Sequence, residues 1–178
     1  MELIEAIKTR RSVRKFNNKK IDINTVKEIV DICQYSPSWK NTQTVRYNYV
    51  ETKDLIEKIS DGVGSDWNKN ILKQAQGIMV LSTINNISGY EKDGTPSTTK
   101  GSHFESFDAG IYADAFVLAC HNFNIGTVIM GIYNEANIKK ILNLPEGESV
   151  SCIIPMGYYD EKPASPKKKL NDVVLRIK

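Results

Sequence analysis

The stretch FESFDAGIYADAFVLACHNF, residues 104–123, decides the fold of this 178-residue chain. Apolar and small side chains recur in it at three- and four-residue intervals, the repeat of an α-helix that packs along one side. We expect this helix to form the core and to end at Asn124 or Gly126. Its apolar stripe would be hard to bury in so small a chain, which favours a dimer. The stripe consists of Phe104, Phe107, Ile111, Ala115, Leu118 and Ala119.

Four shorter segments predict β-strands. Residues 44–51 alternate apolar or aromatic side chains with polar ones, which is the period of a half-buried strand. Residues 77–81 form the continuous apolar run of a buried central strand. Strands are also expected at residues 127–130, directly after the long helix, and at residues 150–158. Buried and half-buried strands therefore occur together in this chain.

Helices are expected between these strands. An apolar stripe runs through residues 24–34, where Asn24 or Thr25 caps the first turn, and a loop rich in Gly, Thr, Ser and Pro covers residues 88–102. The other predicted helices are one that carries Leu3, Ile4 and Ile7, one at residues 54–60 and one at residues 135–144. Helices interleaved with strands of mixed character predict an α+β sandwich. We find no repeat and no boundary, so residues 1–178 are expected to form a single domain.

Composition limits the class of function. The chain has 24 Lys and Arg against 21 Asp and Glu, a net charge of +3, which argues against a general nucleic-acid binder. Phe16 is the one aromatic residue in the basic stretch of residues 10–20, so a set of interleaved side chains that could stack on bases is missing. The three cysteines lie far apart without a C-x-x-C pair, and no signal peptide or membrane span is recognisable. We therefore expect a cytoplasmic protein with no nucleic-acid or membrane partner.

A basic cluster follows the first predicted helix. In Arg10-Arg11-Ser12-Val13-Arg14, two guanidinium groups four residues apart flank a third and a hydroxyl, so that all could converge on one phosphate. The alternative is a solvated basic helix end, which the helix dipole favours. The cluster alone leaves both interpretations open.

A polar segment follows the predicted helix at residues 24–34. Pro37-Ser38-Trp39-Lys40-Asn41-Thr42-Gln43 offers hydroxyl, amide and aromatic groups that could hydrogen-bond a flat polar heterocycle or its ribityl chain. An ordinary turn with an interface tryptophan is the alternative.

Several catalytic motifs are missing from the sequence. The chain contains no G-x-G-x-x-G, no G-x-x-x-x-G-K-[ST] and no G-x-S-x-G, so neither a Rossmann site, a P-loop nor a nucleophile elbow is expected. His103 and His121 have no Cys or acidic partner at metal-ligand spacing. We predict that both histidines are structural or solvated and that the chain has no metal site.

Four segments together resemble the FMN-dependent nitroreductase family, in the family's order and over nearly the whole chain. Residues 10–16 are similar to the family's R-R-S-x-R-x-F pattern, and residues 36–43 to its A-P-S-x-x-N-x-Q pattern. Residues 107–131 are similar to the long dimer-core helix and the strand after it. Residues 154–158 and 166–174 are similar to the G-Y-P and P-R-K-P-L-E-E-V-V segments.

The resemblance implies a set of FMN-binding residues. It implies phosphate and ribityl contacts from the basic cluster, flavin contacts across the dimer from residues 36–43, and ring contacts from the strand after the long helix. Asn68 is implied by a looser match. The implied residues are Arg10, Arg11, Ser12, Arg14, Pro37, Ser38, Trp39, Asn41, Gln43, Asn68, Ile129, Met130, Gly131, Lys167 and Lys168.

Two departures from the family pattern affect this set. Lys167 stands where arginine is usual, which keeps the charge but loses the planar fork, and either Lys167 or Lys168 is the second phosphate contact. Trp39 and Lys40 stand where many relatives carry small residues, which changes the volume over the flavin.

The resemblance also implies architecture and activity. The implied fold is an α/β/α sandwich with a mixed, mostly antiparallel central sheet, and the implied assembly is a homodimer with FMN at the subunit interface. Hydride would pass from NAD(P)H through the flavin to nitroaromatic, quinone or similar acceptors by a ping-pong mechanism, with no catalytic side chain. The alternatives are different flavin chemistry, such as flavin fragmentation or dehalogenation, and a non-catalytic FMN-binding or storage protein.

Overall fold

A four-stranded sheet with strand order β1-β2-β4-β3 forms the centre of the computed structural model, which describes residues 1–165 and 174–176. Each named strand pairs antiparallel with its neighbour, and one parallel bridge joins Ser12 to Thr127. The predicted mixed, mostly antiparallel sheet is therefore confirmed. The strands are β1 (Val45–Val50), β2 (Gly77–Ile84), β3 (Gly126–Thr127) and β4 (Glu148–Gly157).

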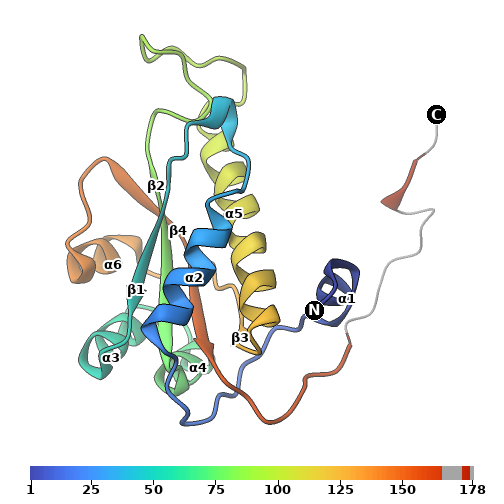
Figure 1. Ribbon diagram of the computed structural model, residues 1–178. Coiled ribbons are helices and arrows are strands. Elements are labelled where there is room, and N and C mark those ends of the chain that lie inside the picture. The colour runs from blue at the N-terminus through green and yellow to red at the C-terminus, as the bar shows by residue number, and fades with distance from the viewer. Residues whose placement is uncertain (166–173, 177–178) are drawn as a thin grey trace.

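Helices cover both faces of this sheet (Figure 1). The two apolar clusters differ in which side chains of β2 they contain: Met79 and Leu81 belong to one, Ile78 and Val80 to the other. This alternation is expected of a strand buried on both faces. The first face packs against α2 (Ile23–Cys33) and α5 (His103–Asn122), and the second against α3 (Lys53–Asp61), α4 (Asp66–Gln74) and α6 (Glu135–Leu142). The α+β sandwich predicted from the sequence is confirmed.

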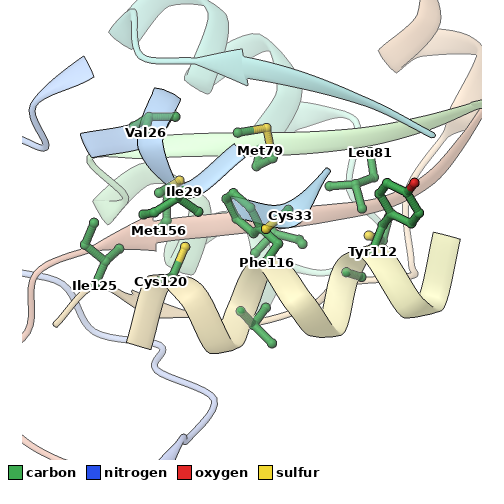
Figure 2. Close-up of a cluster of buried hydrophobic side chains, with 14 of the residues drawn as sticks. Val26, Ile29, Cys33, Met79, Leu81, Tyr112, Phe116, Cys120, Ile125 and Met156 are labelled. Carbon is green, nitrogen blue, oxygen red and sulfur yellow. The ribbon is translucent and has the colours of Figure 1, made fainter. Parts of the chain in front are cut away.

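The long helix α5 is apolar on more than one side. Its buried face includes Tyr112, Phe116 and Cys120, which point towards the sheet in Figure 2. The apolar stripe that was expected to be hard to bury in one chain is only partly covered, since Phe107 is 63% exposed and its other members are half-buried. An acidic residue, Asp108, instead lies on the buried face. Small and apolar residues on both sides made the core face ambiguous in the sequence.

Most boundaries differ from the predictions by one to three residues, and three differences bear on the site. Helix α2 begins after Asp22, whose side chain accepts a hydrogen bond from Asn24 N, so neither Asn24 nor Thr25 is the cap. The strand predicted at residues 127–130 has only two residues, Gly126 and Thr127. Met130 pairs with β4 separately, through an isolated bridge to Ile153. Helix α4 was not predicted, since its sequence is polar apart from a short apolar group.

Helix α1 (Leu3–Thr9) lies beside the C-terminal end of α5, apart from the other helices (Figure 1). Ala6 is its buried residue, whereas Leu3, Ile4 and Ile7 are exposed. A single 3₁₀ turn, η1 (Trp39–Asn41), lies near the opposite end of α5. Among the described residues, no helix is both long and apolar enough to cross a membrane.

Candidate functional site

The basic cluster is fixed beside the edge of the sheet. Val13 N donates to Thr127 O at 2.9 Å, and the Val13 side chain is buried. A Cβ on Gly126 would lie 2.7 Å from Val13 side-chain atoms, so this close approach requires glycine. The buried Phe16 side chain anchors the other end of the segment. The backbone of the cluster is therefore held by the core, while Arg10, Ser12 and Arg14 keep solvent access.

Arg11 has a different role from the other two arginines. Its Nη1 donates to Lys8 O at 2.9 Å and to Arg10 O at 2.7 Å, and its Nη2 donates to Ser165 Oγ at 2.6 Å. Through Arg11, these bonds connect the end of α1 to Ser165, which follows β4 in the chain. Arg11 thus stabilises the backbone of the cluster. Its Nε is buried and has no hydrogen-bond partner in the described part of the chain. Lys167 and Lys168 lie outside the described residues.

The chain after β3 runs next to this cluster. Met130 is buried and its side chain joins the apolar cluster under α3, α4 and α6, so only its backbone can face a ligand. Ile129 is 48% exposed and Gly131 is also exposed. An open cavity of about 520 Å³ extends from Ile129 along α5 to β4. Its lining includes Ser106, Ala109, Gly110, Ala113, Val150 and Cys152.

Asn68 lies in the first turn of α4. The side chain of Ser65 caps this helix by accepting from Asn68 N at 3.2 Å. Gly62, in the turn before α4, accepts a hydrogen bond at its carbonyl oxygen from Asn134 N at 2.8 Å. Asn134 is three residues after Gly131 in the chain. The half-buried Asn68 therefore lies in the first turn of a helix whose preceding loop contacts the chain after Gly131.

The Ser38–Gln43 segment lies at the other end of α5. Trp39 N donates to both carboxylate oxygens of Asp108, and the Trp39 ring packs on Phe104 with a centroid separation of 4.2 Å. Within the segment, Gln43 N donates to Ser38 Oγ at 2.9 Å. The segment is thus attached to the N-terminal third of α5.

The backbone of this segment is unusual. Lys40, Asn41 and Gln43 all have positive φ angles, of 44°, 55° and 51°. The left-handed conformation costs a residue with a Cβ roughly 1–2 kcal/mol, although asparagine tolerates it better. Such strain is retained where surrounding contacts determine the conformation, and it is common at functional sites.

The two expected halves of the site are far apart within one chain. His121, at the C-terminal end of α5, contacts Thr9 beside the basic cluster, whereas Asp108 holds Trp39. Thirteen residues of helix separate them, about 20 Å at 1.5 Å per residue. Within one chain, the basic cluster and residues 38–43 therefore lie at opposite ends of α5.

Two residues of this arrangement, Asp108 and His121, had no predicted role in binding. Asp108 carried one usable indication, since it is an acid among the apolar residues of a core helix and such a buried charge requires specific partners. His121 was predicted to be structural or solvated. In the structure it is buried, and its Nε2 is hydrogen-bonded to Thr9, next to the basic cluster. The sequence offered no indication of its bond to Thr9.

An α/β/α protein with guanidinium and hydroxyl groups beside a sheet edge has the donor set of a phosphate-binding site. The Nitroreductase family model matches residues 7–158. The chain therefore belongs to the Nitroreductase family, which is a family of oxidoreductases.

Individual relatives agree with this assignment. The chain is 25% identical, over 93% of its length and 81% of the relative's, to a Methanothermobacter thermautotrophicus protein provisionally named NADH dehydrogenase/NAD(P)H nitroreductase. It is 22% identical to the iodotyrosine deiodinase of Nematostella vectensis, over 98% of this chain and 74% of that one. A solved Nitroreductase Family Protein from Streptococcus pneumoniae superposes with a TM-score of 0.88 at 18% identity, covering 99% of this chain and 100% of the other. The last comparison shows the shared fold.

Proposed function

We propose that this chain is an FMN-dependent oxidoreductase that uses NAD(P)H to reduce nitroaromatic, quinone or similar acceptors. When bound, FMN supplies the redox chemistry, taking hydride from the nicotinamide and passing it to the acceptor in a ping-pong cycle. The side chains bind and orient, and we assign no catalytic residue.

The donor set beside the sheet edge fits the phosphate end of FMN. Arg10 and Arg14 supply charged forks and Ser12 a hydroxyl, the groups that bind phosphate with short, charge-assisted hydrogen bonds. Arg11 fixes the backbone on which they stand. We propose Lys167 or Lys168 as a further contact, because Arg11 already holds Ser165, close to them in the chain.

The fit extends to the ring end. Ile129, the backbone of Met130 and Gly131, and Asn68 would offer one apolar side chain, backbone groups and an amide to a flat heterocycle. The cavity at Ile129 lies in the size range of small-molecule sites, roughly 300–1,000 Å³. We propose that these residues face the flavin ring.

The observation that carries the proposal is the separation of residues 38–43 from the basic cluster along α5. A two-fold pairing of α5 with the α5 of a second copy, running antiparallel, would bring the 38–43 segment of one chain to the ring end of the flavin site whose phosphate end is the basic cluster of the other. The exposed Phe107 and the half-buried Ile111 and Leu118 provide an apolar surface for that pairing. We therefore propose a homodimer with FMN at its interface, to which Pro37, Ser38, Trp39, Asn41 and Gln43 contribute from the partner.

Unpaired polar atoms support this assembly. Trp39 Nε1 and Thr42 Oγ1 are buried without a hydrogen-bond partner in the described residues, as is Arg11 Nε at the other end. Thr44 Oγ1, Tyr49 OH and Asn85 Oδ1 are unpaired as well. Most buried polar groups in folded proteins are paired, and a second copy would offer partners to Trp39, Thr42 and Arg11. The three cysteines are free and buried, which is compatible with the cytoplasmic location that we propose.

An absorption spectrum of the purified protein, followed by anaerobic addition of NADH or NADPH, tests the proposal. We expect a yellow protein that is bleached by at least one nicotinamide and regains its colour with a nitroaromatic or quinone. A colourless protein that cannot be reconstituted with FMN would contradict it. Bound FMN that neither nicotinamide bleaches would instead indicate a storage protein.

Reductive dehalogenation is a second candidate, favoured by the similarity to a protein named iodotyrosine deiodinase. It uses the same flavin site with a halogenated aromatic acceptor. Iodide release from iodotyrosine by the reduced protein, at a rate above that of nitroaromatic reduction, would favour this function over the first.

A further inference from the structure

Asp108 is a buried carboxylate at the junction of three segments. Its side chain is on α5, the residue is 1% exposed, and none of the ion pairs between described residues includes it. A buried carboxylate is tolerated when hydrogen-bond donors surround it. Trp39 N donates to Oδ1 at 3.1 Å and to Oδ2 at 3.0 Å, and Ser88 Oγ donates to Oδ2 at 2.6 Å.

These bonds connect α5 with two loops. Trp39 opens the strained segment that ends at Gln43, and Ser88 lies in the loop of residues 85–102 between β2 and α5. One turn before Asp108, Phe104 packs against the Trp39 ring. Helix α5 therefore holds Trp39 by its backbone and by its side chain at once.

A second, exposed contact joins the same two loops. Lys40 Nζ lies 2.7 and 2.9 Å from the carboxylate oxygens of Glu91, and Ser97 donates to Glu91 Oε1 at 2.6 Å. Both residues of this ion pair are about half exposed, so solvent screens it. The buried Asp108 contacts are the ones that fix where the segment leaves α5.

We propose that Asp108 is a positioning residue, which sets the orientation of residues 38–43 towards the flavin site of the partner subunit. This inference rests on the proposed function. Asp108 acts through Trp39 N, so it orders residues that would contact the ring end of the flavin and does not act on the phosphate end. Its loss is therefore expected to weaken binding of the ring irrespective of the phosphate.

The test is a comparison of FMN and riboflavin binding by full-length Asp108→Asn, Arg14→Ala and wild-type protein. An amide cannot accept from all three donors, and the loss of such a bond corresponds to about tenfold in affinity. We expect Asp108→Asn to weaken binding of both flavins by about this factor, leaving their ratio unchanged. Arg14→Ala should lower the affinity for FMN alone. Asp61→Asn, the same change at an exposed residue of α3, is the matched control.

A cofactor-free measurement makes the positioning role visible directly. In a Trp67→Phe background, where Trp39 is the remaining tryptophan, Asp108→Asn should increase acrylamide quenching of Trp39 while the midpoint of thermal unfolding stays near that of the background protein. Ser88→Ala removes one donor only and serves as the milder variant if Asp108→Asn does not fold. Ser88→Ala should lower the affinity for both flavins about two- to threefold.

Separate outcomes contradict the two proposals. Wild-type protein that binds neither flavin would overturn the proposed function and this inference together. Wild-type protein that binds FMN, with Asp108→Asn and Ser88→Ala indistinguishable from it, would overturn the inference alone. A loss confined to FMN in Asp108→Asn would also overturn it, because the defect would then lie at the phosphate end.

Discussion

Thr9 and His121 join the N-terminal helix to the end of α5, with 2.9 Å between Thr9 Oγ1 and His121 Nε2. The Thr9 hydroxyl donates its one proton to Glu5 O at 2.7 Å, so it must accept from the imidazole. His121 therefore carries a proton on Nε2 in this arrangement. Arg10 and Arg11 follow directly in the chain.

Acidification is expected to destabilise the protein through this histidine. Burial, the main cause, and the charges of Lys162, Arg10 and Arg11 lower the pKa of His121, while Glu5 acts in the opposite direction. The unfolded chain, with an ordinary histidine pKa of about 6.5, then binds more protons than the folded one, so stability falls as the pH drops below that value.

Thermal unfolding of flavin-free protein at pH 7.5 and pH 5.5 measures this effect. His121→Gln retains an N–H donor for Thr9 but does not titrate. The midpoint temperature of the wild type should decrease more on acidification than that of the glutamine variant. An equal decrease in both proteins would show that His121 does not contribute.

Removal of a phosphate-binding arginine should release FMN. Each charge-assisted hydrogen bond contributes about 1.5–3 kcal/mol, so Arg10→Ala and Arg14→Ala should weaken FMN binding roughly 10- to 100-fold. Lys27→Ala, an exposed charge on α2, is the control and should retain full affinity. Equilibrium titration of protein fluorescence with FMN gives the three constants. Equal affinity in all variants would exclude the phosphate assignment.

The buried face of α5 should dominate the stability of the chain. Phe116 is fully buried between α5 and the sheet, and truncation of such a side chain costs about 3–5 kcal/mol. Urea unfolding of Phe116→Ala should show this loss. Phe123→Ala, at a half-buried position just beyond the same helix, should cost distinctly less. The reverse order would contradict the assignment of the core face.

The opposite face of α5 should decide assembly. Phe107→Asp introduces a charge on the exposed side, where the proposed two-fold pairing buries an apolar side chain. Sedimentation velocity should show wild-type dimers and Phe107→Asp monomers, with loss of bound FMN and a nearly unchanged far-ultraviolet circular dichroism spectrum. A variant that remains a fully flavinated dimer would place the interface elsewhere.

The cysteines should be unreactive in the folded protein. Burial raises the pKa of Cys33 to about 11 and that of Cys152 to about 12, and it raises the pKa of Cys120 as well. Thiolate, the reactive form, is therefore scarce at pH 8. Labelling with a disulfide reagent should proceed only in denaturant, whereas an added exposed thiol, Lys27→Cys, should react at once. Rapid labelling of native wild-type protein would contradict this.

Periodicity predicted the layers of this fold and the buried face of α2, whereas it left the core face of α5 ambiguous. The apolar run at residues 77–81 is buried on both faces, so its interpretation as a central strand did not depend on direction. In α5 the pattern allowed two buried faces. The face that is buried carries Asp108, whose carboxylate accepts hydrogen bonds from Trp39 N and Ser88 Oγ. Contacts between distant segments made that choice, and local sequence does not contain them.

The candidate site shows the same division. Motif order along the chain was enough to identify the family, and the structure joins the basic cluster to β3 through the Ser12–Thr127 bridge, while the phosphate and ring assignments stay predictions. The roles of Arg11 and Met130 differ from the simple prediction of direct side-chain contact. Arg11 is occupied by backbone carbonyls and Met130 is turned into the core, which only the three-dimensional arrangement reveals.

The length of α5 makes the two halves of the proposed site genetically separable. In a dimer formed from one Arg14→Ala chain and one Asp108→Asn chain, one site would contain both lesions and the other site would contain neither. Two defective proteins should therefore complement each other after subunit exchange, with one of the two sites in every mixed dimer restored. A cell that carries both alleles would therefore be more active than a cell that carries either allele alone.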